Sequence, residues 1–295
     1  MIGSSPSGGE TKSMSMGQKS VEIAHLLWDV REKRPLVHNL TNYVTANDCA
    51  NALLAVGASP VMADELDEAS DIAALADAVV INIGTLNART VLSMFAAGKK
   101  AASLGRPVIL DPVGAGASRL RTGTAVRLTR EIPLAVIRGN VSEIKALLGG
   151  VGTTRGVDAD ERDLSADGLG GVAAAARALA LRTGAVVAVT GSTDILTDGS
   201  RTLAVRNGHP FMSRITGSGC MLSAVTGAFC GAAPGRVFEA AAAALCMMGL
   251  AGEQAAERTA GENAGTGSFR TYLIDSLSLM DEAALAGGMK LERFA

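Results

Sequence analysis

A glycine-rich stretch, TGSGC at residues 216–220, precedes an Ala-, Leu- and Val-rich run that is typical of a buried helix. A turn that opens onto a helix leaves backbone N–H groups without acceptors, at the positive end of the helix dipole. Gly217, Ser218 and Gly219 are therefore candidates for an anion hole that holds a phosphate group. Cys220 falls in the first predicted helical turn, where the same field favours its thiolate. The alternative is an ordinary helix start with a small buried cysteine.

Asp111 is the second candidate, because it directly follows an apolar segment at residues 107–110 that reads as a strand. A carboxylate at the end of a strand can hold Mg²⁺ or orient a phosphate group. The alternative is an Asp-Pro turn. That turn would explain Asp111 and the proline after it, but not the glycines that follow.

Arg138 and Glu143 follow the next predicted strand in the sequence RGNVSE. In the functional interpretation, Glu143 lies near an Mg²⁺ ion shared with Asp111, and Arg138 binds ATP phosphates. Asn140 and Glu143 also have the spacing of a capping box, which by itself would explain both residues. Thr190 ends a further strand, where its hydroxyl either contacts a nucleotide or only terminates the strand.

The polar segment HNLTN at residues 38–42 and Met62 end two other short strands. Asn and Thr side chains in such a segment also serve as helix caps. A methionine at a strand end is more often part of the core, although its thioether suits an aromatic heterocycle. For the HNLTN segment, helix capping and hydrogen bonding to a ligand both stay open. For Met62, a place in the core and contact with a heterocycle both stay open.

Strands that alternate with helices along most of the chain predict parallel βαβ units and an α/β fold. Asp198-Gly199 between two short apolar runs predicts a hairpin of antiparallel strands at one edge. In sheets of this kind ligands bind outside the carboxyl ends of the strands, so the candidate residues should gather there. We expect helices over residues 21–32, 46–56 and 268–286, and a surface loop over 149–168. Residues 1–20 are interpreted as a flexible extension and 21–295 as a single domain.

The composition argues against several classes of protein. Net charge is -2, and no basic stripe carries interleaved aromatic residues, so nucleic acid is not an expected partner. The longest apolar run, residues 240–252, is shorter than the roughly 20 residues of a membrane span and predicts a buried helix. The 4 cysteines show no CxxC spacing, which favours reduced thiols in a cytoplasm.

Together these stretches resemble the hydroxyethylthiazole kinase family of the ribokinase-like superfamily. The matching segments follow one another in order from about residue 22 to residue 285. Most ribokinase-like kinases have Asp where this chain, like the thiazole kinases, has Cys220. The segments are HNLTN at 38–42, PVMA at 60–63, NIGT at 82–85, DPVGAGA at 111–117, RGNVSE at 138–143, RGVD at 155–158, VTG at 189–191, TGSGC at 216–220 and GSFR at 267–270.

The resemblance implies a ribokinase-like three-layer sandwich with a mostly parallel central sheet, flanking helices and an antiparallel edge hairpin. It implies ATP- and Mg²⁺-dependent phosphorylation of the hydroxyl of 4-methyl-5-(2-hydroxyethyl)thiazole in thiamine biosynthesis or salvage, by a cytoplasmic homotrimer with sites between subunits. Carried over residue by residue, the resemblance assigns thiazole binding to Met62, Gly217, Asn39 and Thr41, and ATP binding to Arg138 and Thr190. It assigns Mg²⁺ to Asp111 and Glu143, and the anion hole to Gly217, Ser218 and Gly219. Cys220 would accept the hydroxyl proton.

Three other functions are compatible with parts of the sequence. A ribokinase-like kinase for another small alcohol, such as hydroxymethylpyrimidine, would share the fold and differ in its acceptor. A hydrolase with Cys220 as nucleophile would need a histidine such as His38 or His209 beside the thiol. A non-catalytic nucleotide sensor would keep the anion hole without turnover.

Overall fold

The computed structural model describes residues 16–149 and 168–294, in which the strands form one nine-stranded sheet of order β2-β1-β3-β4-β5-β6-β7-β8-β9. Strands β1 to β6 are parallel to one another, and β7, β8 and β9 continue the sheet in antiparallel pairs. The predicted α/β class and edge hairpin are confirmed. The strands are β1 Leu36–Leu40, β2 Ser59–Val61, β3 Ala78–Asn82, β4 Val108–Asp111, β5 Val136–Asn140, β6 Val186–Thr190, β7 Asp194–Thr197, β8 Thr202–Val205 and β9 Leu291–Arg293.

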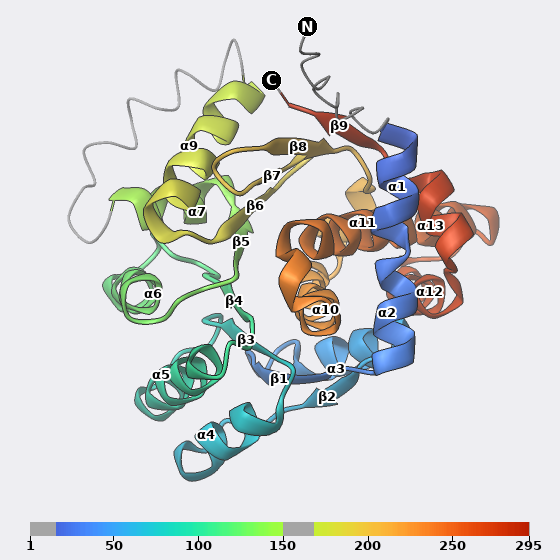
Figure 1. Cartoon of the computed structure of the whole chain (residues 1–295). Helices are drawn as coiled ribbons and strands as arrows, with labels where there is room; N and C mark the ends of the chain where they lie inside the picture. The colour runs from blue at the N-terminus through green and yellow to red at the C-terminus, as the bar shows by residue number, and fades with distance from the viewer. Residues whose placement is uncertain (1–15, 150–167, 295) are drawn as a thin grey trace, which may run out of the picture.

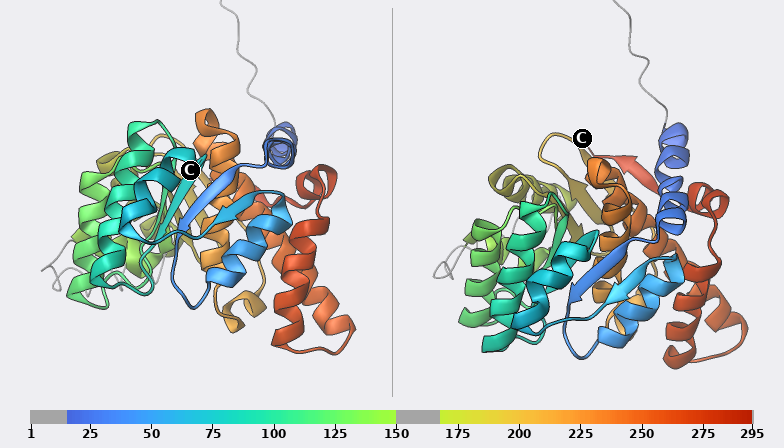
Figure 2. Two further views of the ribbon diagram at one scale, coloured as in Figure 1. Left: turned by 90° about the horizontal axis from the view of Figure 1, so that it is seen from below. Right: turned by 60° about the horizontal axis from the view of Figure 1, so that its bottom comes forward.

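Helices cover both faces of the sheet and give three layers (Figure 1), with a separate apolar core on each face. Figure 2 shows the red carboxyl-terminal helices on the far side of the molecule from the green ones. One layer contains α4 Leu66–Leu75, α5 Ala88–Ser103, α6 Arg119–Glu131, α7 Val141–Gly149 and α9 Gly168–Thr183. The other contains α1 Met16–Ala24, α2 Leu26–Lys33, α3 Ala46–Val56, α10 Ser218–Ala232, α11 Val237–Gly261, α12 Thr266–Leu279 and α13 Glu282–Gly288.

Helix α10 lies directly on the parallel strands, and its small residues make this close approach possible. A Cβ added at Gly227 would lie 2.6 Å from Val80 Cγ2 and 3.0 Å from Val37 Cγ1. Behind α10, the apolar helical stretch Pro234–Gly261 is long enough to cross a membrane, yet 72% of its most apolar window is buried inside the protein. The predicted buried helix is therefore confirmed.

Several element boundaries differ from the predictions. The strands that carry polar site residues run further than expected, because β4 includes Asp111 and β5 ends at Asn140. The single helix expected over 268–286 is two helices, since Asp281 Oδ1 accepts the Ala284 N–H at 2.7 Å and starts α13 anew. The helix expected from residue 21 begins at Met16 and is divided between α1 and α2. The expected loop, apart from its two end residues, and residues 1–15 of the expected extension lie outside the described residues.

We predict that Gly227→Ala destabilises the protein by about 1–3 kcal/mol, because the new methyl group overpacks the contact with β1 and β3. Gly287→Ala in α13 is the matched control, since no heavy atom lies within 4 Å of its added Cβ. Urea unfolding followed by circular dichroism measures both changes. An equal effect of the two substitutions would show that α10 does not depend on this contact.

Candidate active site

The carboxyl ends of β3 to β6 bring the candidate polar residues together beside the start of α10. Asn82 and Asp111 are the last residues of adjacent strands and are paired in register. Arg138 lies in β5, and Thr190 ends β6. The expected gathering of these residues at one edge of the sheet is therefore observed.

Asp111 is the most deeply buried charge at this edge, with no exposed surface. Its Oδ2 accepts hydrogen bonds from Asn82 Nδ2 and Ser223 Oγ, both at 2.8 Å. Its Oδ1 has no hydrogen-bond partner, and Arg138 Nη1 lies 3.6 Å from it. Burial raises the pKa of Asp111 to about 6, although the positive charge of Arg138 opposes the shift. One carboxylate oxygen is thus held rigidly while the other has no hydrogen donor.

The Arg138 side chain lies against the glycine turn. Its Nη2 donates to Thr190 Oγ1 at 2.7 Å, which connects the two residues assigned to ATP. A Cβ at Gly219 would lie 2.6 Å from Arg138 Nη1, so the absence of a side chain there makes room for the guanidinium. The Arg138 Nε is buried without a hydrogen-bond partner. A buried donor without a partner is costly, and an anion at this position would satisfy it.

The turn itself begins helix α10 with a glycine at the N-cap. Gly217 adopts a left-handed conformation, with φ +87°, and a Cβ there would lie 2.9 Å from Thr45 Cγ2. The Ser218 hydroxyl donates to the Met212 carbonyl oxygen at 2.9 Å and so fixes the turn to the preceding segment. In such a helix start the first N–H groups have no intrahelical acceptor.

Two asparagines surround the sulfur of Cys220. Asn42 Nδ2 donates to Cys220 Sγ at 3.3 Å, and Asn82 Nδ2 donates to the same sulfur at 3.2 Å. Asn42 Nδ2 also donates to Asn82 Oδ1 at 3.0 Å. Two N–H donors directed at one sulfur stabilise negative charge on it. The sequence assigned no role to Asn82 and named Asn42 only within the HNLTN segment. Their places in the two matched segments, HNLTN and NIGT, were the only available signal.

Glu143 forms the capping box that its spacing predicted. Its Oε2 accepts the Asn140 N–H at 2.8 Å, while Asn140 Oδ1 accepts the Glu143 N–H at 2.9 Å. Its Oε1 accepts the Gly114 N–H at 2.8 Å. The structural interpretation of this pair is therefore confirmed, and both carboxylate oxygens already accept backbone hydrogen bonds. The role of Glu143 at a metal stays a prediction.

Two cavities lie at the carboxyl ends of the parallel strands, and Ser218 of the glycine turn lines one of them. The smaller, about 210 Å³, is lined by Asn39, Thr41 and Met62 among other residues, so it unites three residues assigned to the thiazole. The larger, about 560 Å³, is lined in part by Arg138, Thr190 and Ser218. Asn39 Nδ2 donates to the Val37 carbonyl oxygen, whereas its buried Oδ1 has no hydrogen-bond partner. Because the two cavities have different lining residues, Asn39, Thr41 and Met62, assigned to the alcohol, lie apart from Arg138 and Thr190, assigned to ATP.

The chain's histidines have other partners than Cys220. His38 Nε2 lies 2.6 Å from the Ala63 carbonyl oxygen, and burial lowers the pKa of His38. His209 Nδ1 accepts the Phe211 N–H at 3.2 Å, and His25 Nδ1 pairs with Glu282. Within residues 16–149 and 168–294 no hydrogen bond joins a histidine to Cys220, so the histidine that a cysteine hydrolase would need is not observed beside the thiol. The same residues contain no cluster of three or more His, Cys, Asp or Glu side chains suited to a metal.

Comparison with known proteins identifies the family. The model of the hydroxyethylthiazole kinase family matches residues 27–283. The chain is 50% identical over 268 residues to a hydroxyethylthiazole kinase of Ruminiclostridium cellulolyticum, and this match covers 90% of this chain and 96% of that protein. It is 51% identical over 279 residues to that of Desulfovibrio desulfuricans, which covers 92% of this chain and 98% of that protein.

Solved structures agree with this relationship. The structure of hydroxyethylthiazole kinase protein from Pyrococcus horikoshii superposes with a TM-score of 0.82 at 40% identity, covering 93% of this chain and 99% of that one. A ribokinase-like superfamily protein from Enterococcus faecalis has a TM-score of 0.52 at 12% identity, covering 82% of this chain and 87% of that one. The second likeness concerns the fold alone and confirms the ribokinase-like sandwich.

We predict that Asp111 makes the protein less stable as pH rises from about 4 to about 6. In the folded protein the carboxyl keeps its proton up to about pH 6, whereas an unfolded Asp loses it near pH ~4. The folded state therefore binds more protons in this window, and stability present below it is lost across it, by about 3 kcal/mol.

Asp111→Asn removes this titration, so its free energy of unfolding should fall less than that of the wild type over the same window. Urea unfolding of both metal-free proteins at several pH values measures the difference. Asp194, whose pKa burial also raises to about 6, remains in both proteins and cancels in the comparison. Parallel pH profiles for the two proteins would contradict the assignment.

Proposed function

The chain belongs to the hydroxyethylthiazole kinase family, and we propose that it transfers the γ-phosphoryl group of ATP to the hydroxyl of 4-methyl-5-(2-hydroxyethyl)thiazole. The observation that carries the proposal is that the glycine turn lines one cavity and is joined by a hydrogen bond to the segment that lines another. Ser218 of the turn lines the larger cavity. Cys220 accepts a hydrogen bond from Asn42, whose neighbours Thr41 and Tyr43 line the smaller one. In this proposal a phosphoryl group held at the turn is approached by ATP from one cavity and by the alcohol from the other.

In this proposal ATP occupies the larger cavity with its phosphates at the turn. Arg138 supports this orientation, because its buried Nε has no partner and its guanidinium lies against Gly219. The Thr190 hydroxyl accepts from Arg138 and holds it in place. Phosphoryl transfer depends on positioning and on stabilisation of negative charge rather than on covalent chemistry. The free N–H groups of the turn and Arg138 supply that stabilisation.

The alcohol occupies the smaller cavity, with Asn39, Thr41 and Met62 around the thiazole and its hydroxyl toward Cys220. As the hydroxyl oxygen bonds to the γ-phosphorus, the bond from that phosphorus to the bridging oxygen breaks and ADP leaves. The Cys220 sulfur, as thiolate, accepts the hydroxyl proton and becomes a thiol. The amide groups of Asn42 and Asn82 donate to the sulfur and hold it in place. The Gly217 backbone completes the substrate contacts.

Mg²⁺ fits beside Asp111. The Oδ1 of this buried carboxylate has no hydrogen donor, and an oxygen of this kind is the ligand that Mg²⁺ prefers. Glu143 would contribute its charge to the same site, through water, because both its oxygens accept backbone N–H groups. When bound, Mg²⁺ neutralises phosphate charge. The donor set thus supports the metal role of Asp111 more strongly than that of Glu143.

We also infer that the protein is a cytoplasmic homotrimer that acts in thiamine biosynthesis or salvage. Apolar side chains around the smaller cavity support assembly, because Tyr43 is 81% exposed, Val44 57% and Met62 38%. A neighbouring subunit would remove this apolar surface from water and close the cavity. The thiazole site would then lie between subunits.

The proposal is tested by ADP release with Mg²⁺ and ATP, comparing the hydroxyethylthiazole with the hydroxymethylpyrimidine. We expect turnover with the thiazole alcohol and little with the pyrimidine. Arg138→Met should lower kcat by roughly 10²–10³-fold, because one charge-stabilising group is lost at the turn. Arg119→Met, at the exposed first residue of α6, is the matched control and should retain wild-type turnover.

Turnover with the pyrimidine alone would keep the reaction class and reject the thiazole as acceptor. ADP release with neither alcohol, in a protein that still binds ATP, would indicate a nucleotide sensor.

A further inference from the structure

A third cavity, of about 820 Å³, lies at the amino ends of the parallel strands, on the opposite edge of the sheet from the glycine turn. Strand β8 runs in the same direction as β6, because each pairs antiparallel with β7. Thr202, the first residue of β8, lines this cavity. Asn207 and Gly208, which follow the end of β8, line the cavity of about 560 Å³ in which ATP is proposed to bind. A molecule bound here would therefore not contact Cys220 or Asp111.

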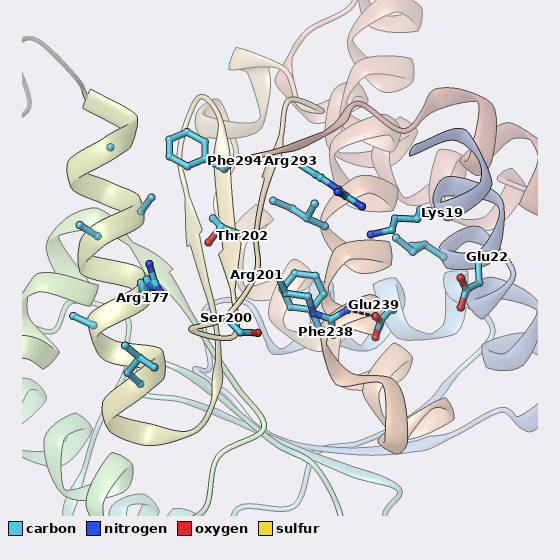
Figure 3. Close-up of a pocket in the computed structure, with 17 residues that line it drawn as sticks. Lys19, Glu22, Arg177, Ser200, Arg201, Thr202, Phe238, Glu239, Arg293 and Phe294 are labelled. Carbon is cyan, nitrogen blue, oxygen red and sulfur yellow. Dashed lines mark hydrogen bonds and ion pairs between the residues drawn. The ribbon is translucent and has the colours of Figure 1, made fainter. Parts of the chain in front are cut away.

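The cavity exists partly because α9 presents a face of small residues. Gly170, Ala174 and Ala178 follow one another at intervals of four residues, so they lie on one side of the helix and all line the cavity. Figure 3 shows α9 on one side and α1 on the other, with the β7–β8 hairpin between them. The volume is within the usual range of ligand pockets, roughly 300–1,000 Å³.

Two of the lining cations have no acidic partner. Lys19 of α1 and Arg293 of β9 form no side-chain hydrogen bond or ion pair with any described residue, and Figure 3 shows them extending toward one another. The lining acids are already paired, since Glu239 lies 2.7 Å from Arg201 and Glu22 lies 2.7 Å from Arg236. Like charges that face each other repel, and an anion between them relieves the repulsion.

Apolar surface adjoins these charges. Phe238, at the start of α11, is 6% exposed, and the Arg201 guanidinium lies 4.0 Å from the centre of its ring. Ile23 and Leu203 are buried in the same wall. A ligand that reached both features would carry a negative group and an apolar body.

We propose that this cavity binds a small organic anion with an aromatic or aliphatic body, its charged group between Lys19 and Arg293. The body packs against Ile23, Leu203 and Phe238. The site is separate from the proposed kinase site, because it shares no lining residue with either cavity at the carboxyl ends of the strands.

The test measures binding of 8-anilinonaphthalene-1-sulfonate, an aromatic anion, by isothermal titration calorimetry and fluorescence. We expect binding to the full chain that Lys19→Ala/Arg293→Ala weakens by about tenfold or more, because two charge-assisted contacts are lost. Lys19→Arg/Arg293→Lys keeps both charges and should bind within about threefold of the wild type. Inorganic phosphate should bind much more weakly than the aromatic anion, because it lacks the apolar body.

Lys100→Ala/Arg119→Ala removes the same charge from surfaces outside the cavity and is the matched control. Circular dichroism and thermal unfolding establish that every variant is folded. Equal loss in the control, or unchanged binding in the cavity variant, would overturn the proposal. So would the absence of any saturable binding to the wild type. Loss of kinase activity has no bearing on these outcomes.

Discussion

The burial of one carboxylate, Asp111, organises the edge of the sheet where the candidate active site lies. A fully buried charge is tolerated only where fixed donors or an opposite charge compensate it. Here Ser223 connects it to α10, Asn82 connects it to the Cys220 sulfur, and Arg138 supplies the nearby positive charge. The compensation is incomplete, because Oδ1 has no hydrogen donor. Because Oδ1 can still accept a ligand bond, a cation site beside it is physically reasonable.

Glycine determines how closely the other groups approach. Gly219 lets the Arg138 guanidinium rest on the turn, and Gly227, two helical turns later, lets α10 rest on the strands that carry the site. Gly217 supplies a backbone conformation that other residues rarely adopt. The same helix thus packs in the core of the fold at one position and begins at the proposed anion hole at another.

The sequence predicted the fold well because strand and helix alternation is a local signal, and the edge of the sheet follows from parallel topology. It also placed Asp111, Arg138 and Thr190 at that edge. It could not show that Asn42 and Asn82 meet at Cys220, because those contacts join residues far apart in the chain. The sequence also predicted one helix over residues 268–286, because the capping role of Asp281, which begins α13, was not anticipated. The third cavity involves α1, α9, α11 and the β7–β9 edge, so no single segment reveals it.

The central claim is direct transfer at the glycine turn, with Cys220 accepting a proton and never carrying the phosphoryl group. The stereochemical course at phosphorus tests it most directly, with ATP made chiral at the γ-phosphorus by oxygen isotopes and sulfur. A single in-line displacement inverts the configuration, and inversion is the result this account predicts. Retention would require two displacements through a covalent phospho-enzyme, as a nucleophilic cysteine would give, and would contradict the account.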